Sequence, residues 1–222
     1  KDRTETGRTL SGNYLAGRHA QAQRDLSAAT DFLGAALKQT PDAPGLLHRT
    51  FILLTVEGRV EEATNLARRL LALKPEAPIA NLALAVDDFK RGRYVAARKR
   101  LDGLPKTGLM HVVAPVLSAW SLMGEKKSED ALMALKPGTK DKGTQALHRL
   151  HAALINEMLS RKDEAEKNYL AVSNNGNDRS IRVVQLLGAL YERTGSPDKA
   201  RALYENYLSE RPGSQLLNVA LG

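Results

Sequence analysis

Apolar residues follow one another at helical spacing along most of the chain, and among them an alanine recurs at an almost constant interval. The six recurring alanines are Ala29, Ala63, Ala97, Ala131, Ala165 and Ala200. The interval is 34 residues, except for a last one of 35. A period of this length is typical of stacked helix pairs, each of which buries its apolar face against its neighbours. The pattern predicts an all-α chain of about six helix pairs.

Turn signals recur with the same period. The position five residues before each alanine is a glycine in three units, at Gly58, Gly92 and Gly195. In the other three units the same position holds Arg24, Lys126 and Ser160. Glycine tolerates the left-handed backbone that ends a helix, so these residues predict the end of each first helix. Twelve residues after the alanine comes a proline at Pro41, Pro75 and Pro212. Since proline cannot continue a helix, it predicts the end of the second helix.

These spacings make the chain resemble the tetratricopeptide repeat (TPR) family. Within that family it resembles the bacterial proteins that contain many repeats. The last unit carries the family pattern almost whole, in Val184, Leu187, Gly188, Tyr191, Ala200, Tyr204 and Pro212. The first unit keeps Gly17, Ala29, Leu33, Ala36 and Pro41. The resemblance covers roughly residues 9 to 212. It implies a right-handed α-α superhelix, a TPR-like solenoid, whose concave face holds a protein or peptide partner.

The repeat divides the chain into three parts. We expect an N-terminal extension over residues 1–8, a repeat array over 9–212, and the start of a further helix over 214–222. The expected units lie near 10–43, 44–77, 78–109, 110–143, 144–179 and 180–213. The chain opens at Lys1 rather than at Met, and it stops while this further helix is under way. We therefore expect it to be a truncated piece of a longer protein.

The spacing of the first helices predicts which side chains line the concave groove. The candidates are Tyr14, Arg18, His48, Ile52, Leu82, Val86, Phe89, Leu150, Leu154, Arg182 and Gln185. This groove has an apolar centre and polar ends, which favours an extended or helical apolar segment as its ligand. The alternative for Leu82, Val86 and Phe89 is ordinary core, because a register error of one residue exchanges the two faces of a helix.

Trp120 is the only tryptophan and belongs to the fourth unit, which has two extra residues between Gly124 and Ala131. Counted from Gly124, Trp120 takes the position that the core tyrosine usually holds. We therefore favour a core role. An exposed Trp120 would instead be the best anchor for a partner.

Charge and composition narrow the classes of partner. The net charge of +8 favours acidic partners. Basic residues gather at Lys90, Arg91, Arg93, Arg98, Lys99, Arg100 and Lys106, which makes a nucleic-acid-binding repeat protein one alternative. We favour a solvated convex face, because Asp87, Asp88 and Asp102 interrupt the cluster. No apolar run is long enough to span a membrane.

The sequence offers no catalytic or cofactor motif. Cysteine is absent, which excludes disulfides and thiolate metal sites. His148 and His151 could reach one metal ion from a helix, but Glu157 is too far along to complete the site. We therefore expect no metal, no cofactor and no enzymatic activity.

The leading hypothesis is a non-catalytic protein-interaction scaffold, in which a homo-oligomer is an open alternative. A second hypothesis is a substrate-selecting repeat region of a larger enzyme. The opening Leu10 to Arg18 is similar to the start of the mature region in long exported TPR proteins, some of which are envelope adaptors. That similarity favours the periplasm or envelope over the cytoplasm.

Overall fold

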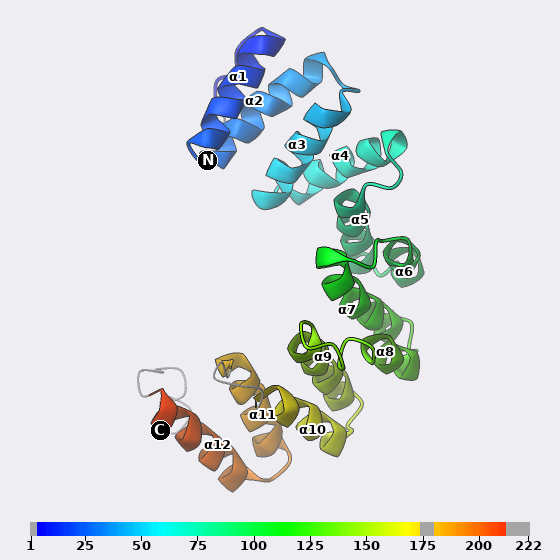
Figure 1. Cartoon of the computed structure of the whole chain (residues 1–222), viewed down its shortest axis with the longest axis vertical. Coiled ribbons are helices and arrows are strands. Elements are labelled where there is room, and N and C mark those ends of the chain that lie inside the picture. Colours follow the sequence, from blue (N-terminus) through cyan, green and yellow to red (C-terminus); the bar gives the residue numbers. More distant parts are fainter. Residues whose placement is uncertain (1–3, 174–179, 212–222) are drawn as a thin grey trace. The chain divides into compact units, whose positions relative to one another are not determined.

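The computed structural model describes residues 4–173 and 180–211, and in these residues the chain forms twelve α-helices and no strand (Figure 1). The prediction of an all-α chain with about six helix pairs is confirmed. The helices fall into two compact units, with the division between Lys106 and Thr107. We call them the N-terminal and the C-terminal unit and describe each by itself. The further helix expected over 214–222 lies outside the described residues.

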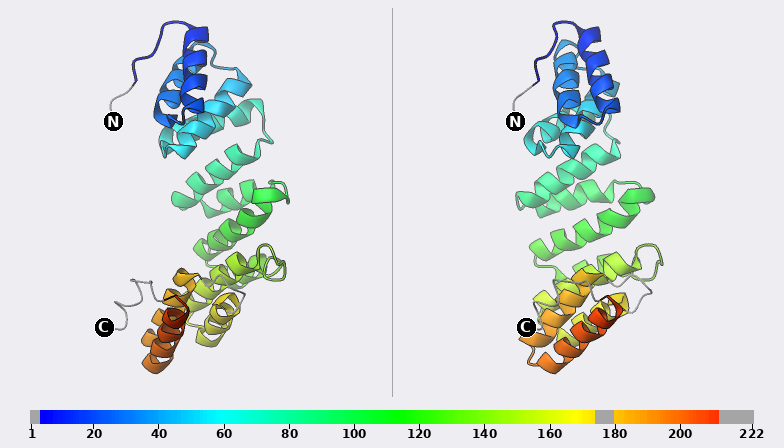
Figure 2. Two further views of the ribbon diagram at one scale, coloured as in Figure 1. Left: turned by 60° about the vertical axis from the view of Figure 1, so that its left-hand side comes forward. Right: turned by 90° about the vertical axis from the view of Figure 1, so that its left-hand side faces the viewer.

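The N-terminal unit consists of three helix pairs. They are α1 (Leu10–Ala22) with α2 (Leu26–Gln39), α3 (Pro44–Val56) with α4 (Val60–Leu73), and α5 (Pro78–Lys90) with α6 (Tyr94–Asp102). Neighbouring pairs pack through α2 against α3 and through α4 against α5. The extended segment before α1, dark blue in Figure 2, is tied to α2 because the Thr4 amide donates to the Asp31 carboxylate at 3.0 Å.

The C-terminal unit also consists of three pairs in the described residues. They are α7 (Gly108–Gly124) with α8 (Ser128–Leu135), α9 (Gln145–Met158) with α10 (Lys162–Ser173), and α11 (Ile181–Arg193) with α12 (Pro197–Glu210). Here α8 packs against α9, and α10 packs against α11. Helix α7 is continuous through Pro115. Among the described residues, no helix combines the length and apolar character that a membrane crossing requires.

All six first helices end in the same hydrogen-bonded turn. The predicted turn residues all have left-handed backbone, with φ of 61°, 73°, 72°, 61°, 59° and 76° at Arg24, Gly58, Gly92, Lys126, Ser160 and Gly195. The residue after each donates its amide to the carbonyl five residues earlier, as Arg59 does to Leu54 at 2.9 Å and Ser196 to Tyr191 at 2.9 Å. This is the Schellman arrangement, which satisfies the carbonyls that a helix end leaves open.

The six recurring alanines lie at the contacts between helices, because each is at most 4% exposed. Beside them, small and large residues compensate for one another within each pair. The position seven residues before the left-handed residue holds Gly17, Phe51, Ala85, Ala119, Ala153 and Gly188. The position four residues after the recurring alanine holds, in the same order, Leu33, Ala67, Leu101, Leu135, Tyr169 and Tyr204.

The two end pairs show how close this contact is. A Cβ on Gly17 would lie 2.7 Å from Leu33 Cδ2, and one on Gly188 would lie 2.1 Å from the Tyr204 hydroxyl. Glycine is therefore required at both places by packing rather than by its backbone. In the second pair the order of sizes is reversed. The large residue, Phe51, lies on the first helix, the small one, Ala67, lies on the second, and both belong to one buried cluster.

Candidate partner-binding site

The candidate groove residues of the N-terminal unit occupy equivalent positions on its three first helices. The position ten residues before the left-handed residue holds Tyr14, His48 and Leu82 in the three pairs. The position six residues before it holds Arg18, Ile52 and Val86. None of these side chains is buried, and Tyr14 and Val86 are 36% and 38% exposed. Phe89 is half-buried and packs edge-on against Tyr94. The buried apolar residues of α5 are instead Ala80, Leu84 and Ala85.

The candidates of the C-terminal unit share the same register. Leu150 and Leu154 stand ten and six residues before the left-handed Ser160, and Gln185 stands ten residues before Gly195. Both leucines are half-buried and pack with one edge against the apolar cluster of α10 to α12. Gln185 is also half-buried, whereas Arg182 is exposed. Each leucine thus contributes to the core and still presents part of its surface to solvent.

The prediction that Trp120 takes the core tyrosine position is wrong, because the register was counted from Gly124. Helix α7 runs through Gly124, and the left-handed residue of this pair is Lys126. Lys126 precedes Ala131 by the usual five residues, so the pair contains no insertion. The tyrosine position then belongs to Leu122, which is 8% exposed. Trp120 instead shares the register of Leu154 and joins the groove candidates, which is the alternative that the sequence left open for it.

Trp120 is only partly buried, and a histidine fixes its indole ring. Its Nε1 donates to His151 Nδ1 at 3.0 Å, and the two rings meet edge to face with centroids 6.0 Å apart. Because His151 accepts at Nδ1, it is neutral in this arrangement. Burial, and secondarily the nearby His148, lower the pKa of His151 below its usual value. The indole ring of Trp120 is therefore held by a hydrogen bond that needs an uncharged histidine.

The other histidine that the sequence offered as a metal ligand lies in the core. His148 is 1% exposed, and its Nε2 lies 3.1 Å from the carbonyl oxygen of Val112. A Cβ on Gly138 would collide with its ring, so the loop after α8 closes directly over it. Within residues 4–173 and 180–211, no three His, Cys, Asp or Glu side chains converge on a common metal position.

Two of the three aspartates that interrupt the basic cluster are buried beneath it, whereas Asp102 and most of the basic residues are exposed, as expected of a solvated face. Asp87 and Asp88 are 9% and 6% exposed. Arg68 and Arg91 bind Asp87 at 3.2 and 2.9 Å, and Arg100 binds Asp88 at 2.9 Å. Although burial alone would raise the pKa of Asp88, the hydrogen bonds from Arg100 and Arg93 hold it below its usual value. Arg91, Arg93 and Arg100 of the cluster are thus paired with internal carboxylates.

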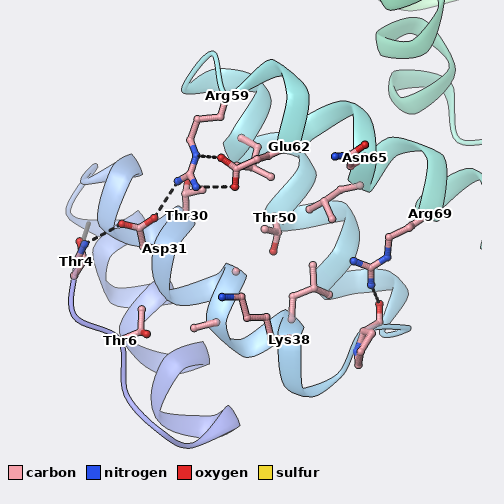
Figure 3. A pocket seen from close by; sticks show the side chains of 16 residues that line it. Thr4, Thr6, Thr30, Asp31, Lys38, Thr50, Arg59, Glu62, Asn65 and Arg69 are labelled. Atoms are coloured by element: carbon pink, nitrogen blue, oxygen red, sulfur yellow. Dashed lines mark hydrogen bonds and ion pairs between the residues drawn. The ribbon is translucent and has the colours of Figure 1, made fainter. Parts of the chain in front are cut away.

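A pocket that the sequence analysis did not predict lies between the second helices of the N-terminal unit. It has a volume of about 430 Å³ and is lined by α2, α4, part of α3 and the segment around Thr4 and Thr6 (Figure 3). None of the eleven groove candidates lines it. At one end Arg59 binds Asp31 at 3.0 Å and Glu62 through two bonds of 2.9 and 2.8 Å. The hydrogen bonds to Glu62 and Asp31 raise the pKa of Arg59.

Solved structures, rather than related sequences, show which known proteins this architecture resembles. No protein-family model matches the sequence, and no curated protein matches it. Among solved structures, a tetratricopeptide repeat protein from Parabacteroides merdae is 17% identical, with a TM-score of 0.72 over 92% of this chain and 80% of the other. PilW, a type IV pilus biogenesis factor, is 13% identical, with a TM-score of 0.71 over 97% of this chain and 100% of the other.

A third similar structure is YrrB, described as a TPR protein with an unusual peptide-binding site. It is 16% identical, with a TM-score of 0.55 over 86% of this chain and 98% of the other. At these identities the likeness is one of fold. The predicted family resemblance is thereby confirmed: this chain has the tetratricopeptide-repeat fold and resembles that family through its six helix pairs.

Proposed function

We propose that this protein is a non-catalytic scaffold whose first helices bind an apolar or amphipathic segment of a partner protein. One observation carries the proposal. Six residues before the left-handed turn, five of the six pairs have an apolar residue, at Ile52, Val86, Trp120, Leu154 and Ala189, and none of these is buried. Apolar side chains that recur at one position without being buried are typical of a binding surface.

Polar candidates border this apolar stripe in each unit. In the N-terminal unit these are Arg18 and His48, and in the C-terminal unit Arg182 and Gln185. Such residues would set the register of a bound segment through hydrogen bonds, while the apolar residues supply most of the affinity. Helix-in-groove binding of this kind uses anchors spaced three or four residues apart on the ligand.

Two further points belong to the same proposal. The internal pairing of the arginines around Asp87 and Asp88 argues against nucleic acid as the main partner, because nucleic-acid binding needs cations that neutralise phosphates and so release the counter-ions condensed on the nucleic acid. A role in the bacterial envelope is supported by the similarity of fold to PilW, a type IV pilus biogenesis factor.

Affinity capture from the native cell tests the proposal. The baits are the unaltered protein, the double variant Ile52→Asp with Leu154→Asp, and the control Lys162→Ala, which changes an exposed residue at the start of α10. We expect the same partner with the unaltered and control baits and its loss from the double variant, provided that circular dichroism shows all three folded. Partners that the double variant retains in full would contradict a groove on the first helices.

A further inference from the structure

We propose that the pocket between α2 and α4 is a second binding site, separate from the groove, for a carboxylate with a short apolar body. Its volume of about 430 Å³ lies in the range of small-molecule sites. The pocket belongs entirely to the N-terminal unit, and it lies on the second helices rather than the first. The proposal therefore does not depend on the proposed groove.

The pocket owes its space to a glycine that the repeat does not require. Gly34 stands five residues after the recurring alanine, where the other pairs have Arg68, Asp102, Lys136, Leu170 and Glu205. A Cβ built on Gly34 meets nothing within 4 Å, in contrast to Gly17 and Gly188. Glycine inside a helix is less favourable than alanine. Because Gly34 lines the pocket, where a larger side chain would take up space, we infer that Gly34 keeps the pocket open.

The interior of the pocket is suited to a short apolar body. Besides Gly34, its walls include Ala35 and Leu37 of α2, Leu54 of α3 and Leu66 of α4. The deeply buried lining residues are Leu37 and Leu54, each 4% exposed, with Thr30 and Thr50, each 2% exposed. Both threonine hydroxyls already donate to carbonyls of their own helices, so the base of the pocket presents mainly apolar surface. An aliphatic chain of a few carbons would be removed from water in the pocket, and each methylene group that it buries would strengthen binding.

Two cations stand near the end of α2, and they give the site its preference for an anion. Lys38 has no partner among the residues that the structure describes, and it lines the pocket in the last turn of α2. Arg69 of α4 donates one Nη2 hydrogen bond to the carbonyl of Pro41, three residues beyond Lys38. Arg69 lies at one end of the pocket and the Arg59 ion pairs at the other (Figure 3).

Arg59 does not compete for this anion, because Asp31 and Glu62 already bind its guanidinium. The cations left for a carboxylate are thus Lys38 and, through its remaining donors, Arg69. Charge-assisted hydrogen bonds of this type are stronger than neutral ones. Both a free small acid and the C-terminal residue of a peptide have the required chemistry, a carboxylate joined to an apolar chain.

The test uses octanoate and its neutral counterpart octan-1-ol as probes of the full chain. Binding is followed through the Gly34 amide signal in two-dimensional nuclear magnetic resonance spectra. We expect octanoate to shift this signal saturably below ~10 mM and octan-1-ol to bind at least about 5-fold more weakly. Lys38→Gln and Arg69→Gln should each weaken octanoate binding by about 5-fold or more and leave octan-1-ol binding unchanged.

Gly34→Leu fills the pocket and has a matched control. Gly45 also lies in a helix, and a Cβ there also meets nothing within 4 Å, but Gly45 does not line the pocket. Both leucine variants should fold, because leucine favours helices over glycine. Octanoate binding, read from other pocket amides, should fall at least about 10-fold in Gly34→Leu and remain in Gly45→Leu. Unchanged binding in Gly34→Leu would overturn the proposal.

A peptide arm separates the two sources of the carboxylate. Acetyl-Gly-Gly-Leu with a free C-terminus is compared with the same peptide as its amide. If the acid form binds and the amide does not, the site accepts a peptide C-terminus. If octanoate alone binds, the ligand is a free small acid. If neither carboxylate shifts the pocket amides, the proposal is wrong, whatever the capture experiment shows about the groove.

Discussion

At the scale of single residues, backbone conformation explains why certain side chains recur and others vary. Three of the six left-handed turn residues are glycines, and three are Arg24, Lys126 and Ser160. A residue with a Cβ pays about 1–2 kcal/mol for left-handed backbone. The three non-glycine turns therefore carry a cost that the Schellman hydrogen bonds of the same turn help to offset.

Ser160→Gly should stabilise the protein by up to about 1 kcal/mol, because glycine adopts left-handed backbone without a steric penalty. The reciprocal variant Gly195→Ser should destabilise it by a similar amount. Urea denaturation followed by circular dichroism at 222 nm measures both changes. A lower midpoint for Ser160→Gly would show that the serine side chain makes a contribution larger than the strain.

Stability should fall as the pH drops below about 6.5, where an unfolded histidine becomes protonated. Burial lowers the pKa of His151 in the folded state, so the unfolded chain binds the proton first. The contribution of neutral His151 to the free energy of unfolding is fully present above the pKa of the unfolded histidine. It is lost as the pH falls through the lower pKa of His151 in the folded state. Protonation of Nδ1 also removes the acceptor of the Trp120 indole.

The measurement is the free energy of unfolding between pH 8 and pH 5, together with Trp120 fluorescence. His151→Gln should reduce the pH dependence, because glutamine can accept the indole hydrogen bond but does not titrate. His148 and the exposed His111–Asp141 pair lie in the same unit and are unchanged in this variant, so they provide the internal reference. An identical pH profile for the variant would exclude His151 as the responsible group.

At the scale of helix pairs, what matters is the summed volume at the paired positions rather than either residue alone. Five pairs place a small residue on the first helix and a large one on the second, whereas the second pair places Phe51 on the first and Ala67 on the second. Both members of the second pair are fully buried. The repeat thus tolerates either order because close packing constrains volume.

Phe51→Ala should cost about 3–5 kcal/mol through the cavity it leaves, and Ala67→Leu about 1–3 kcal/mol through overpacking. The double variant recreates the order of the other pairs, so its loss should be smaller than that of Phe51→Ala alone. A double-mutant cycle in urea yields the coupling energy. Strictly additive losses would mean that the two positions do not share one contact.

At the scale of the whole molecule, binding should depend on the first helices and respond little to the basic cluster. A partner obtained by capture should lose about 1–3 kcal/mol of affinity on Leu154→Ala, as buried interface anchors do. Lys99→Ala should matter only at low salt, because exposed charges are screened at physiological ionic strength. Calorimetric titration of the three proteins at two salt concentrations measures this contrast. A loss confined to Lys99→Ala would move the binding site to the basic face.

The sequence by itself determined the repeat, the helical class and the six turns. These features rest on local interactions: a left-handed residue and the alanine five positions later belong to one turn between consecutive helices. Their spacing is therefore readable without knowledge of any distant contact. Nine of the eleven groove candidates follow from the same local register, ten or six residues before the left-handed residue, and all eleven lie on helices with exposed or half-buried side chains.

Only the tertiary structure decided the features that depend on contacts between helices. Trp120 was misassigned because Gly124 looks like a turn residue, although it ends a helix before the turn at Lys126. One partner of the buried Asp87 is Arg68, which α4 supplies from 19 residues away. The pocket beside Gly34 requires α2 and α4 to lie next to each other. Packing brings such residues together without leaving a periodic signal, so no reading of spacing along the chain could have found them.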